Sequence, residues 1–274
     1  MNLKTKEATA MIGFIGGGNM AEAMIKGMAA RGIKDILVSE PRQERRQHLE
    51  QLYNLKTTSN NVELTNGCNV VVIAIKPQNL SAIADELKDV DFTNKTVISI
   101  MAGINLSTLE KVFRTKNIVR VMPNTPALEQ EGMSVMSARD TVSDNTINRA
   151  KDILSSIGKI LTLPETLMDA VTALSGSGPA FIAHFVDSMI EAGEKLGLAR
   201  DIATILAIQT MTGTAKLLST GITPQELIKM VASPGGTTEA GLNILNNRDT
   251  KDIVTQTLTA AHQRSIELGK KLSG

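Results

Sequence analysis

The sequence predicts a doubly wound α/β sheet of Rossmann type over residues 1–164, followed by an all-α domain over residues 165–274. In the first half, short β-branched runs alternate with amphipathic segments, as in folds built around a parallel sheet. Pro164 ends this alternation, and helical periodicity then continues almost to the C-terminus. Glycines separate the helical segments, notably at Gly197, Gly221 and the pair Gly235-Gly236.

The strands of the first half are short apolar runs, and the run at 70–75 is almost wholly aliphatic, as a buried central strand requires. Strands are predicted at 11–15, 36–38, 70–75, 97–100, 118–122, 134–137 and 159–163, with helices at 21–30, 41–53, 78–87, 106–113 and 143–157. Strict alternation of the two predicts a doubly wound sheet.

Helices are predicted in the second half at 168–174, 180–196, 201–218, 224–231 and from 237 to the end, with 250–272 as the last long piece. The segments 180–196 and 201–218 are apolar over much of their circumference and therefore need burial on more than one side. We expect two subunits to share this domain, which makes the protein a homo-oligomer through its helical domain. Burial against the first half of the same chain is the alternative.

Composition limits the class of ligand. The 29 basic and 28 acidic residues nearly cancel, so the chain lacks the charge of a nucleic-acid binder. One cysteine and three scattered histidines show no metal-ligand spacing, so we expect no metal. No apolar run has the length of a signal peptide or a membrane span. The expected protein is cytoplasmic and binds a small molecule, with no nucleic acid and no membrane as partner.

A glycine-rich turn follows the first predicted strand. In the run Gly16-Gly17-Gly18-Asn19-Met20-Ala21, Gly16 permits a tight turn and Gly18 lets a pyrophosphate approach the backbone. Ala21 is small enough for the helix to pack on the strand. The helix start that follows offers unpaired amides to a negative charge. Placed between strand and helix, this pattern predicts a dinucleotide site.

The second strand ends in conflicting signals about the cofactor. Glu40 suits the ribose hydroxyls of NAD, whereas Ser39, Arg42 and Arg45 suit the 2′-phosphate of NADP. NADP and NAD therefore both remain open, and a flavin is a third, less suitable ligand.

Other residues expected at the same edge of the sheet come from several segments. Ala74, Lys76 and Pro77 end a central strand, and a polar loop at 59–61 contains Asn61. Small residues, including Ala102 and Gly103, end the next strand and leave room for a nicotinamide ring. Ligands of open parallel sheets bind at this carboxyl edge.

The helical half carries two glycine-rich helix starts. At residues 232–242, Gly235 and Gly236 precede Thr237 and Thr238, so the unpaired amides of a helix start could bind a small anion. The alternative is an ordinary Ser/Thr N-cap behind a glycine turn. At residues 175–179, Ser177 is either an N-cap before a first-turn proline or part of the site.

Together these motifs resemble pyrroline-5-carboxylate reductase. The resemblance lies in residues 16–21, 75–78, 121–126, 174–180 and above all Ser-Pro-Gly-Gly-Thr-Thr at 233–238, and it extends from about Met11 to the end. It implies reduction of 1-pyrroline-5-carboxylate to L-proline by hydride transfer from NAD(P)H, the final step of proline biosynthesis. It also implies a dimer built by the helical domain, or an assembly of such dimers.

The resemblance also implies roles for individual residues. Thr238 would bond the ring nitrogen as the catalytic residue, and the loop amides would hold the carboxylate. The implied substrate residues are Ser233, Gly235, Gly236, Thr237, Thr238 and Ser177. The implied cofactor residues are Gly16, Gly18, Asn19, Met20, Ser39, Glu40, Asn61, Ala74, Lys76, Pro77, Ala102 and Gly103. The resemblance slightly favours NADP as the cofactor. Glu40 argues for NAD, because members that use NADP often have a small hydroxylic residue at this position.

Two alternative functions are set against this interpretation. A dehydrogenase of the 3-hydroxyacid type needs a catalytic lysine on the long interdomain helix, but Lys195 lies late in that helix, far from Ser177. A non-catalytic dinucleotide sensor would leave the loop at 233–238 without a purpose. A protonated cyclic imine is already an electrophile, which fits a site without an evident His or Asp base.

Overall fold

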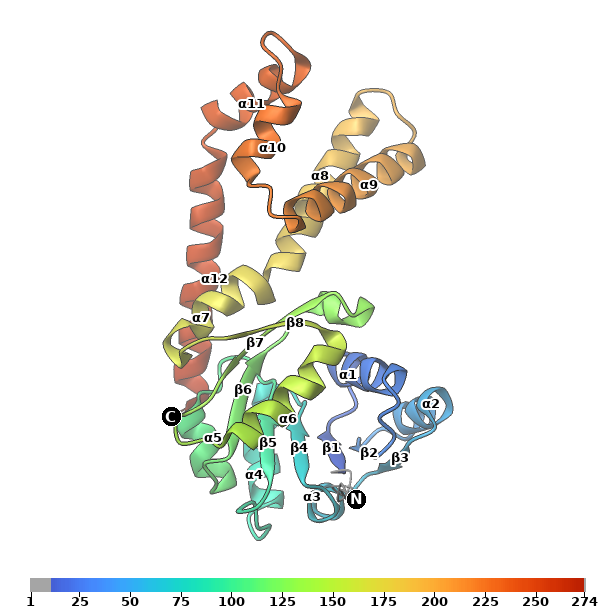
Figure 1. The fold of residues 1–274 in the computed structure, drawn as a ribbon, viewed down its shortest axis with the longest axis vertical. Coiled ribbons are helices and arrows are strands. Elements are labelled where there is room, and N and C mark those ends of the chain that lie inside the picture. Colours follow the sequence, from blue (N-terminus) through green and yellow to red (C-terminus); the bar gives the residue numbers. More distant parts are fainter. Residues whose placement is uncertain (1–10, 274) are drawn as a thin grey trace, which may run out of the picture. The chain divides into compact units, whose positions relative to one another are not determined.

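The structure, a computed structural model, describes residues 11–273, which form two compact units (Figure 1). The first unit contains the chain up to Ser177 together with the C-terminal segment from Ala261, and the second unit is Gly178–Ala260. The domain boundary predicted at residue 164 stays a prediction. No helix among the described residues has the length and apolar content needed to cross a bilayer.

The first unit is built on an eight-stranded sheet with the order β3-β2-β1-β4-β5-β6-β7-β8. The strand order reverses its direction between β1 and β4, which confirms the predicted doubly wound sheet. All neighbours are parallel except β6 and β7. The strands are β1 (Ile12–Ile15), β2 (Ile36–Ser39), β3 (Lys56–Thr58), β4 (Val70–Ile73), β5 (Thr96–Ser99), β6 (Ile118–Met122), β7 (Gly132–Ser137) and β8 (Gly158–Thr162).

Helices cover both faces of this sheet and bury its alternating side chains. One face packs on α1, α2 and α6, and the other packs on α3, α4 and α5. These helices, with the shorter α7, are α1 (Asn19–Ala30), α2 (Gln43–Tyr53), α3 (Asn61–Gly67), α4 (Leu80–Glu86), α5 (Leu106–Phe113), α6 (Asp144–Leu154) and α7 (Met168–Val171). Phe14 and Phe113 are fully buried, one on each face.

Two features of the first unit differ from the sequence prediction. The segment at 54–67 contains β3 and α3, where only a polar loop at 59–61 is predicted; Asn60 caps α3 by accepting a bond from the Glu63 amide at 3.0 Å. Strict alternation is also wrong between β6 and β7, which are antiparallel and joined by a short 3-10 helix, Thr125–Glu129. A parallel crossover needs a dozen or more residues, and the connection is shorter.

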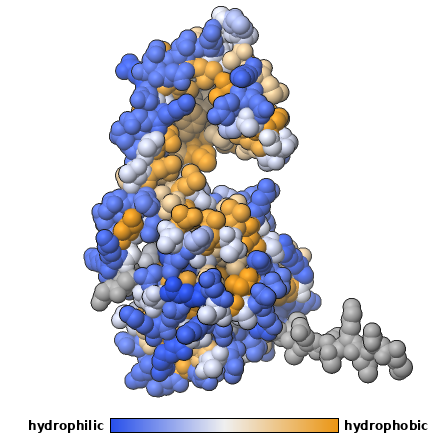
Figure 2. Space-filling view, turned by 60° about the vertical axis from the view of Figure 1, so that its left-hand side comes forward, coloured by the Kyte–Doolittle hydropathy of each residue, from blue (hydrophilic) through white to orange (hydrophobic). Residues whose placement is uncertain are grey.

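The second unit is entirely helical, as predicted. It contains α8 (Gly178–Lys195), α9 (Arg200–Ser219), α10 (Pro224–Val231), α11 (Thr237–Asn247) and the first part of α12 (Thr250–Ser273). Its buried core is small, with Ile190 of α8 packed against Ala203 and Ala207 of α9. Large apolar side chains on these helices remain exposed in the single chain (Figure 2).

The segment before α8 excludes the N-cap, which was one of the two alternatives for Ser177. Residues Thr172–Gly176 form a π-helical turn, and the Ser177 amide donates to the Thr172 carbonyl at 2.8 Å. Ser177 has a helical backbone, with φ −85° and ψ −24°, so the chain is already helical where a cap was expected. Such π turns occur frequently at functional sites.

Candidate functional site

The turn between β1 and α1 has the geometry that its glycines predict. Gly16 adopts φ +98°, and a Cβ there would lie 2.6 Å from the Ala74 carbonyl oxygen, so only glycine fits. Gly18 is the N-cap of α1, with φ −69°, and nothing lies within 4 Å of the position of a Cβ. The backbone at Gly18 is therefore open to a ligand, at the positive end of a helix dipole.

A cavity of about 610 Å³ lies at the carboxyl ends of β1, β2 and β4. Its volume is typical of ligand sites, and its location is the point where the strand order reverses. The structure brings seven predicted cofactor residues together around it, namely Gly16, Gly18, Ser39, Glu40, Asn61, Ala74 and Lys76. Asn19 and Met20 do not line it, since Met20 packs on the core and Asn19 begins α1, but both amides belong to the helix start.

A second cavity, of about 460 Å³, lies within the same unit. The first residues of its lining, Pro77 and Gln78, follow β4 in the chain. Pro77, Ala102, Gly103 and Ser177, all predicted from the sequence, line it. Gln78 and Thr172 line it as well, together with Ala261, Arg264, Ser265 and Leu268 of α12. Sequence reasoning missed the α12 residues, because nothing local indicates that the last helix returns to the sheet edge.

Hydrogen bonding and close backbone packing hold α12 at this cavity. Ser265 donates to Asp169 of α7 at 2.6 Å, and Ser265 is buried. A Cβ at Gly269 would lie 2.9 Å from the Gly103 carbonyl oxygen, so the helix backbone approaches the loop after β5 closely.

Glu40 is the central acidic group of the first cavity. Its buried carboxylate accepts bonds from the Gly17 amide at 3.0 Å and from the Arg42 amide and Nε at 3.2 and 2.7 Å. Burial by itself would raise the pKa of Glu40, but the bonds from Arg42 and Gly17 outweigh it, so the pKa is lowered. Glu40 is therefore a charged acceptor at the end of β2.

A second charged cluster lies behind the turn, on α1 and α2. Arg45 donates through Nε to the Gly17 carbonyl at 2.6 Å and through Nη2 to Glu22. His48 Nε2 lies 2.9 Å from Glu22, and the Tyr53 hydroxyl donates to Glu22 at 3.1 Å. Burial opposes ionisation of Glu22, yet the bonds from His48 and Arg45 lower its pKa. Burial and the Glu22 carboxylate raise the pKa of Tyr53 to about 12.

In the second unit, the loop before α11 is a helix start without a side-chain cap. Gly236 is the N-cap, and no side chain caps it, so the Ser/Thr N-cap interpretation is wrong. The Gly236 amide donates to the Ser233 carbonyl at 3.0 Å, and Gly235, with φ +70°, donates to Glu239 at 2.7 Å. The amides of Thr237 and Thr238 have no acceptor within residues 11–273. Thr237 is exposed and Thr238 is half-buried.

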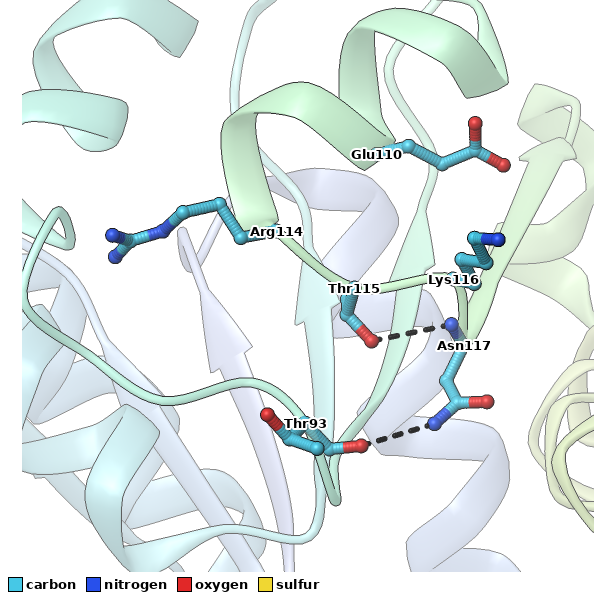
Figure 3. Close-up of a pocket in the computed structure, with 6 residues that line it drawn as sticks. All are labelled: Thr93, Glu110, Arg114, Thr115, Lys116 and Asn117. Atoms are coloured by element: carbon cyan, nitrogen blue, oxygen red, sulfur yellow. Dashed lines mark hydrogen bonds between the residues drawn. The ribbon is translucent and has the colours of Figure 1, made fainter.

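A hollow of about 370 Å³ at the opposite edge of the sheet is a weaker candidate (Figure 3). Polar groups of its lining already bond one another. The backbone amide of Asn117 donates to Thr115 Oγ1, and Asn117 Nδ2 donates to the Thr93 carbonyl, both at 3.2 Å. Figure 3 shows Arg114 directed away from Lys116, so the two cations do not converge. Across residues 11–273, no three His, Cys, Asp or Glu side chains are grouped as metal ligands.

Comparison with protein families gives two matches. Residues 165–268 match the family described as pyrroline-5-carboxylate reductase dimerisation. Residues 11–103 match the family described as NADP oxidoreductase, coenzyme F420-dependent. The two matched segments agree with a dinucleotide-binding sheet followed by a helical dimerisation domain.

Similar proteins match over nearly their whole length. Pyrroline-5-carboxylate reductases of Synechocystis and Pseudomonas aeruginosa are each 39% identical, over 95% and 97% of this chain and 98% and 99% of their own. The structure of a Coxiella burnetii pyrroline-5-carboxylate reductase has a TM-score of 0.89 at 34% identity, covering 95% of this chain and 99% of that one. A Plasmodium falciparum pyrroline carboxylate reductase with NADP bound has a TM-score of 0.85 at 33% identity, with coverages of 95% and 98%.

The cluster behind the turn predicts an unusual titration of Tyr53, the only tyrosine in a chain without tryptophan. We expect the phenolate absorbance of the folded protein to appear with a midpoint near pH 12. Because the raised pKa favours the neutral phenol, this contribution to stability is present below the unfolded pKa of about 10 and is lost as the pH rises through the folded value.

Glu22→Gln removes the charge beside the phenol and should lower the midpoint. Glu44→Gln, nine residues before Tyr53 on α2, makes the same change in charge and should leave the midpoint unchanged. A midpoint near that of an exposed tyrosine in the folded wild type would contradict the described cluster.

Proposed function

The chain belongs to the pyrroline-5-carboxylate reductase family, and from that premise we propose which of its residues bind the cofactor and the imine acid. It is an oxidoreductase that reduces 1-pyrroline-5-carboxylate to L-proline with NAD(P)H. The observation that carries the residue assignments is the convergence of cofactor residues from separate segments on two successive cavities at one sheet edge.

The two cavities suit the two halves of a dinucleotide. We place the pyrophosphate at the turn of Gly16 and Gly18, where the open backbone at Gly18 leaves room for it. The adenosine half then lies beside Glu40 and Asn61, and the nicotinamide half beside Ala102 and Gly103. When bound, the reduced nicotinamide supplies the hydride.

We propose that the chain prefers NADH. Glu40 is buried and charged at the position where a 2′-phosphate would bring further negative charge, whereas ribose hydroxyls can donate to its carboxylate. Of the two arginines that favour NADP in the sequence, Arg42 lines the cavity and Arg45 does not. Arg45 holds the Gly17 carbonyl and Glu22, and Arg42 pairs with Glu40 itself.

The loop at 233–238 is the proposed substrate site. The amides of the helix start bind the carboxylate of the imine acid, and Thr238 Oγ1 accepts a bond from the protonated ring nitrogen. This bond keeps the proton on the nitrogen while the ring carbon accepts hydride, so no side-chain base is required. Ser177 lines the second cavity and stays a predicted substrate residue.

We further propose that the second unit forms the homodimer. Large side chains of α9 are exposed in the single chain, including Ile205 at 63%, Leu206 at 52% and Ile208 at 52%. Together with neighbours on α8 they form an apolar surface of the kind that oligomers bury. The family match over this region is a dimerisation domain. The expected cytoplasmic location stays a prediction.

Thr238→Ala should lower the turnover of pyrroline-5-carboxylate by about tenfold or more, because a hydrogen bond to a charged group contributes about 1.5–3 kcal/mol. The oxidation of NADH in the presence of the imine acid gives the rate. Thr238→Ser keeps the hydroxyl and should retain most of the activity, and the KM for NADH should not move in either variant. Turnover that is the same in the alanine variant as in wild type would remove Thr238 from the mechanism.

Glu40→Ser should reduce the preference for NADH over NADPH, measured as the ratio of the two kcat/KM values, by about tenfold or more. The variant loses the acceptor for the ribose hydroxyls and the negative charge that opposes a 2′-phosphate. Glu44→Gln makes the same change in net charge outside the cavity and should keep the wild-type ratio. An unaltered ratio in Glu40→Ser refutes the role of Glu40.

Ile205→Glu should convert the dimer to a monomer in light scattering, because a buried unpaired carboxylate is costly at an apolar interface. Leu52→Glu provides the matched control, since Leu52 is similarly exposed, at 59%, but lies on α2 of the first unit. If Ile205→Glu remains dimeric, α9 is not at the interface.

A further inference from the structure

The peptide between Gly17 and Gly18 is held from the side away from the cavity. Arg45 Nε donates to the Gly17 carbonyl at 2.6 Å, and Arg45 is not among the residues that line the cavity. In a trans peptide the carbonyl and the amide of the next residue point in opposite directions. The Gly18 amide is therefore directed away from Arg45, and Gly18 itself lines the cavity.

The other polar atom of Gly17 is held as well. Its amide donates to Glu40 at 3.0 Å, so the two bonds fix the residue from two elements, the end of β2 and α2. Glycine has more conformational freedom to lose than any other residue, and a turn of three glycines has no side chains to restrain it. The neighbouring side chains supply that restraint.

Arg45 is built into the frame of the unit and is not a free cation. Its side chain is only 17% exposed, whereas that of Arg42 is 67% exposed. The far end of its guanidinium pairs with Glu22, which His48 and Tyr53 also contact. Two of its three guanidinium nitrogens are thus bonded within the unit, and Arg45 does not line the cavity.

We propose that Arg45 is a positioning residue for cofactor binding: by holding the Gly17 carbonyl, it aims the Gly18 amide at the pyrophosphate of the dinucleotide. This role rests on the proposed pyrophosphate site. Because NADH and NADPH both contain the pyrophosphate, Arg45 would support the binding of either cofactor and would not select NADPH. The amides of Gly18, Asn19 and Met20 have no acceptor within residues 11–273, so they are available together as donors.

Arg45→Met and Arg45→Gln form a matched pair for the test. Both lose the contact with Glu22, but the glutamine Nε2 occupies the place of the arginine Nε and can still donate to the Gly17 carbonyl. Binding of NADH and NADPH is measured by fluorescence of the reduced cofactor without substrate. Arg45→Met should raise both Kd values by the same factor, about tenfold, and Arg45→Gln by less than about threefold.

Two controls separate this role from others. Arg31→Met removes another arginine, the C-cap of α1, which donates to the backbone carbonyl of Ser155, and it should leave both Kd values unchanged. Gly18→Ala places a methyl group in open space at an ordinary φ, so it should fold normally and lose dinucleotide binding.

Specific outcomes overturn the proposal. Wild-type affinity in Arg45→Met, or a loss confined to NADPH, refutes positioning; the second result makes Arg45 a ligand of the 2′-phosphate. If Gly18→Ala binds NADH with wild-type affinity, the proposed pyrophosphate site is wrong. If Gly18→Ala loses affinity for NADH but Arg45→Met does not, the pyrophosphate site stands and only the positioning role of Arg45 is refuted. Should Arg45→Met not fold, the Gly18 amide resonance of ¹⁵N-glycine-labelled wild type is followed during NADH titration. An unmoved resonance overturns the proposal. With a shift, Kd values of Arg45→Gln within about threefold of wild type support the role of Arg45, and a larger loss refutes it.

Discussion

The hydrogen bond from the Gly17 amide to the buried Glu40 carboxylate is the constraint on which the first cavity depends. It joins the end of β2 to the turn after β1, and these two segments form adjacent walls of the cavity. Glu40 remains charged although buried, because three donors from Gly17 and Arg42 compensate for the water that it loses. One carboxylate thus supports the glycine turn and, under the proposed function, selects the cofactor.

The proposed chemistry needs little from side chains, which agrees with the residues present. A protonated imine requires orientation and a partner for its proton, and backbone amides at two helix starts can hold the two anionic groups, pyrophosphate and carboxylate. Both starts, at Gly18 and Gly236, have glycine as the N-cap and no side-chain cap. We therefore propose that a helix N-terminus with a glycine N-cap binds the cofactor in the first unit and the substrate in the second.

Much of this could be predicted from local sequence rules. The strands around Val70 and Ile118, the glycine turn and the helical second half all carry periodic or motif signals. The three-residue strand at Lys56 has no such signal. The side-chain N-caps considered at Ser177 and before α11 are absent, because Ser177 already has a helical backbone and the N-cap of α11 is Gly236. The return of α12 to the sheet edge and the direction of Arg45 depend on tertiary packing, which residue identity alone does not specify.

A crystal structure of the chain with NADH tests the central claim most directly. We expect the Gly18 amide nitrogen to lie within hydrogen-bonding distance, about 3 Å, of a pyrophosphate oxygen, with Arg45 and Glu40 still bonded to Gly17. A Gly17 carbonyl turned toward the cofactor, or a pyrophosphate bound away from Gly18, would contradict the account.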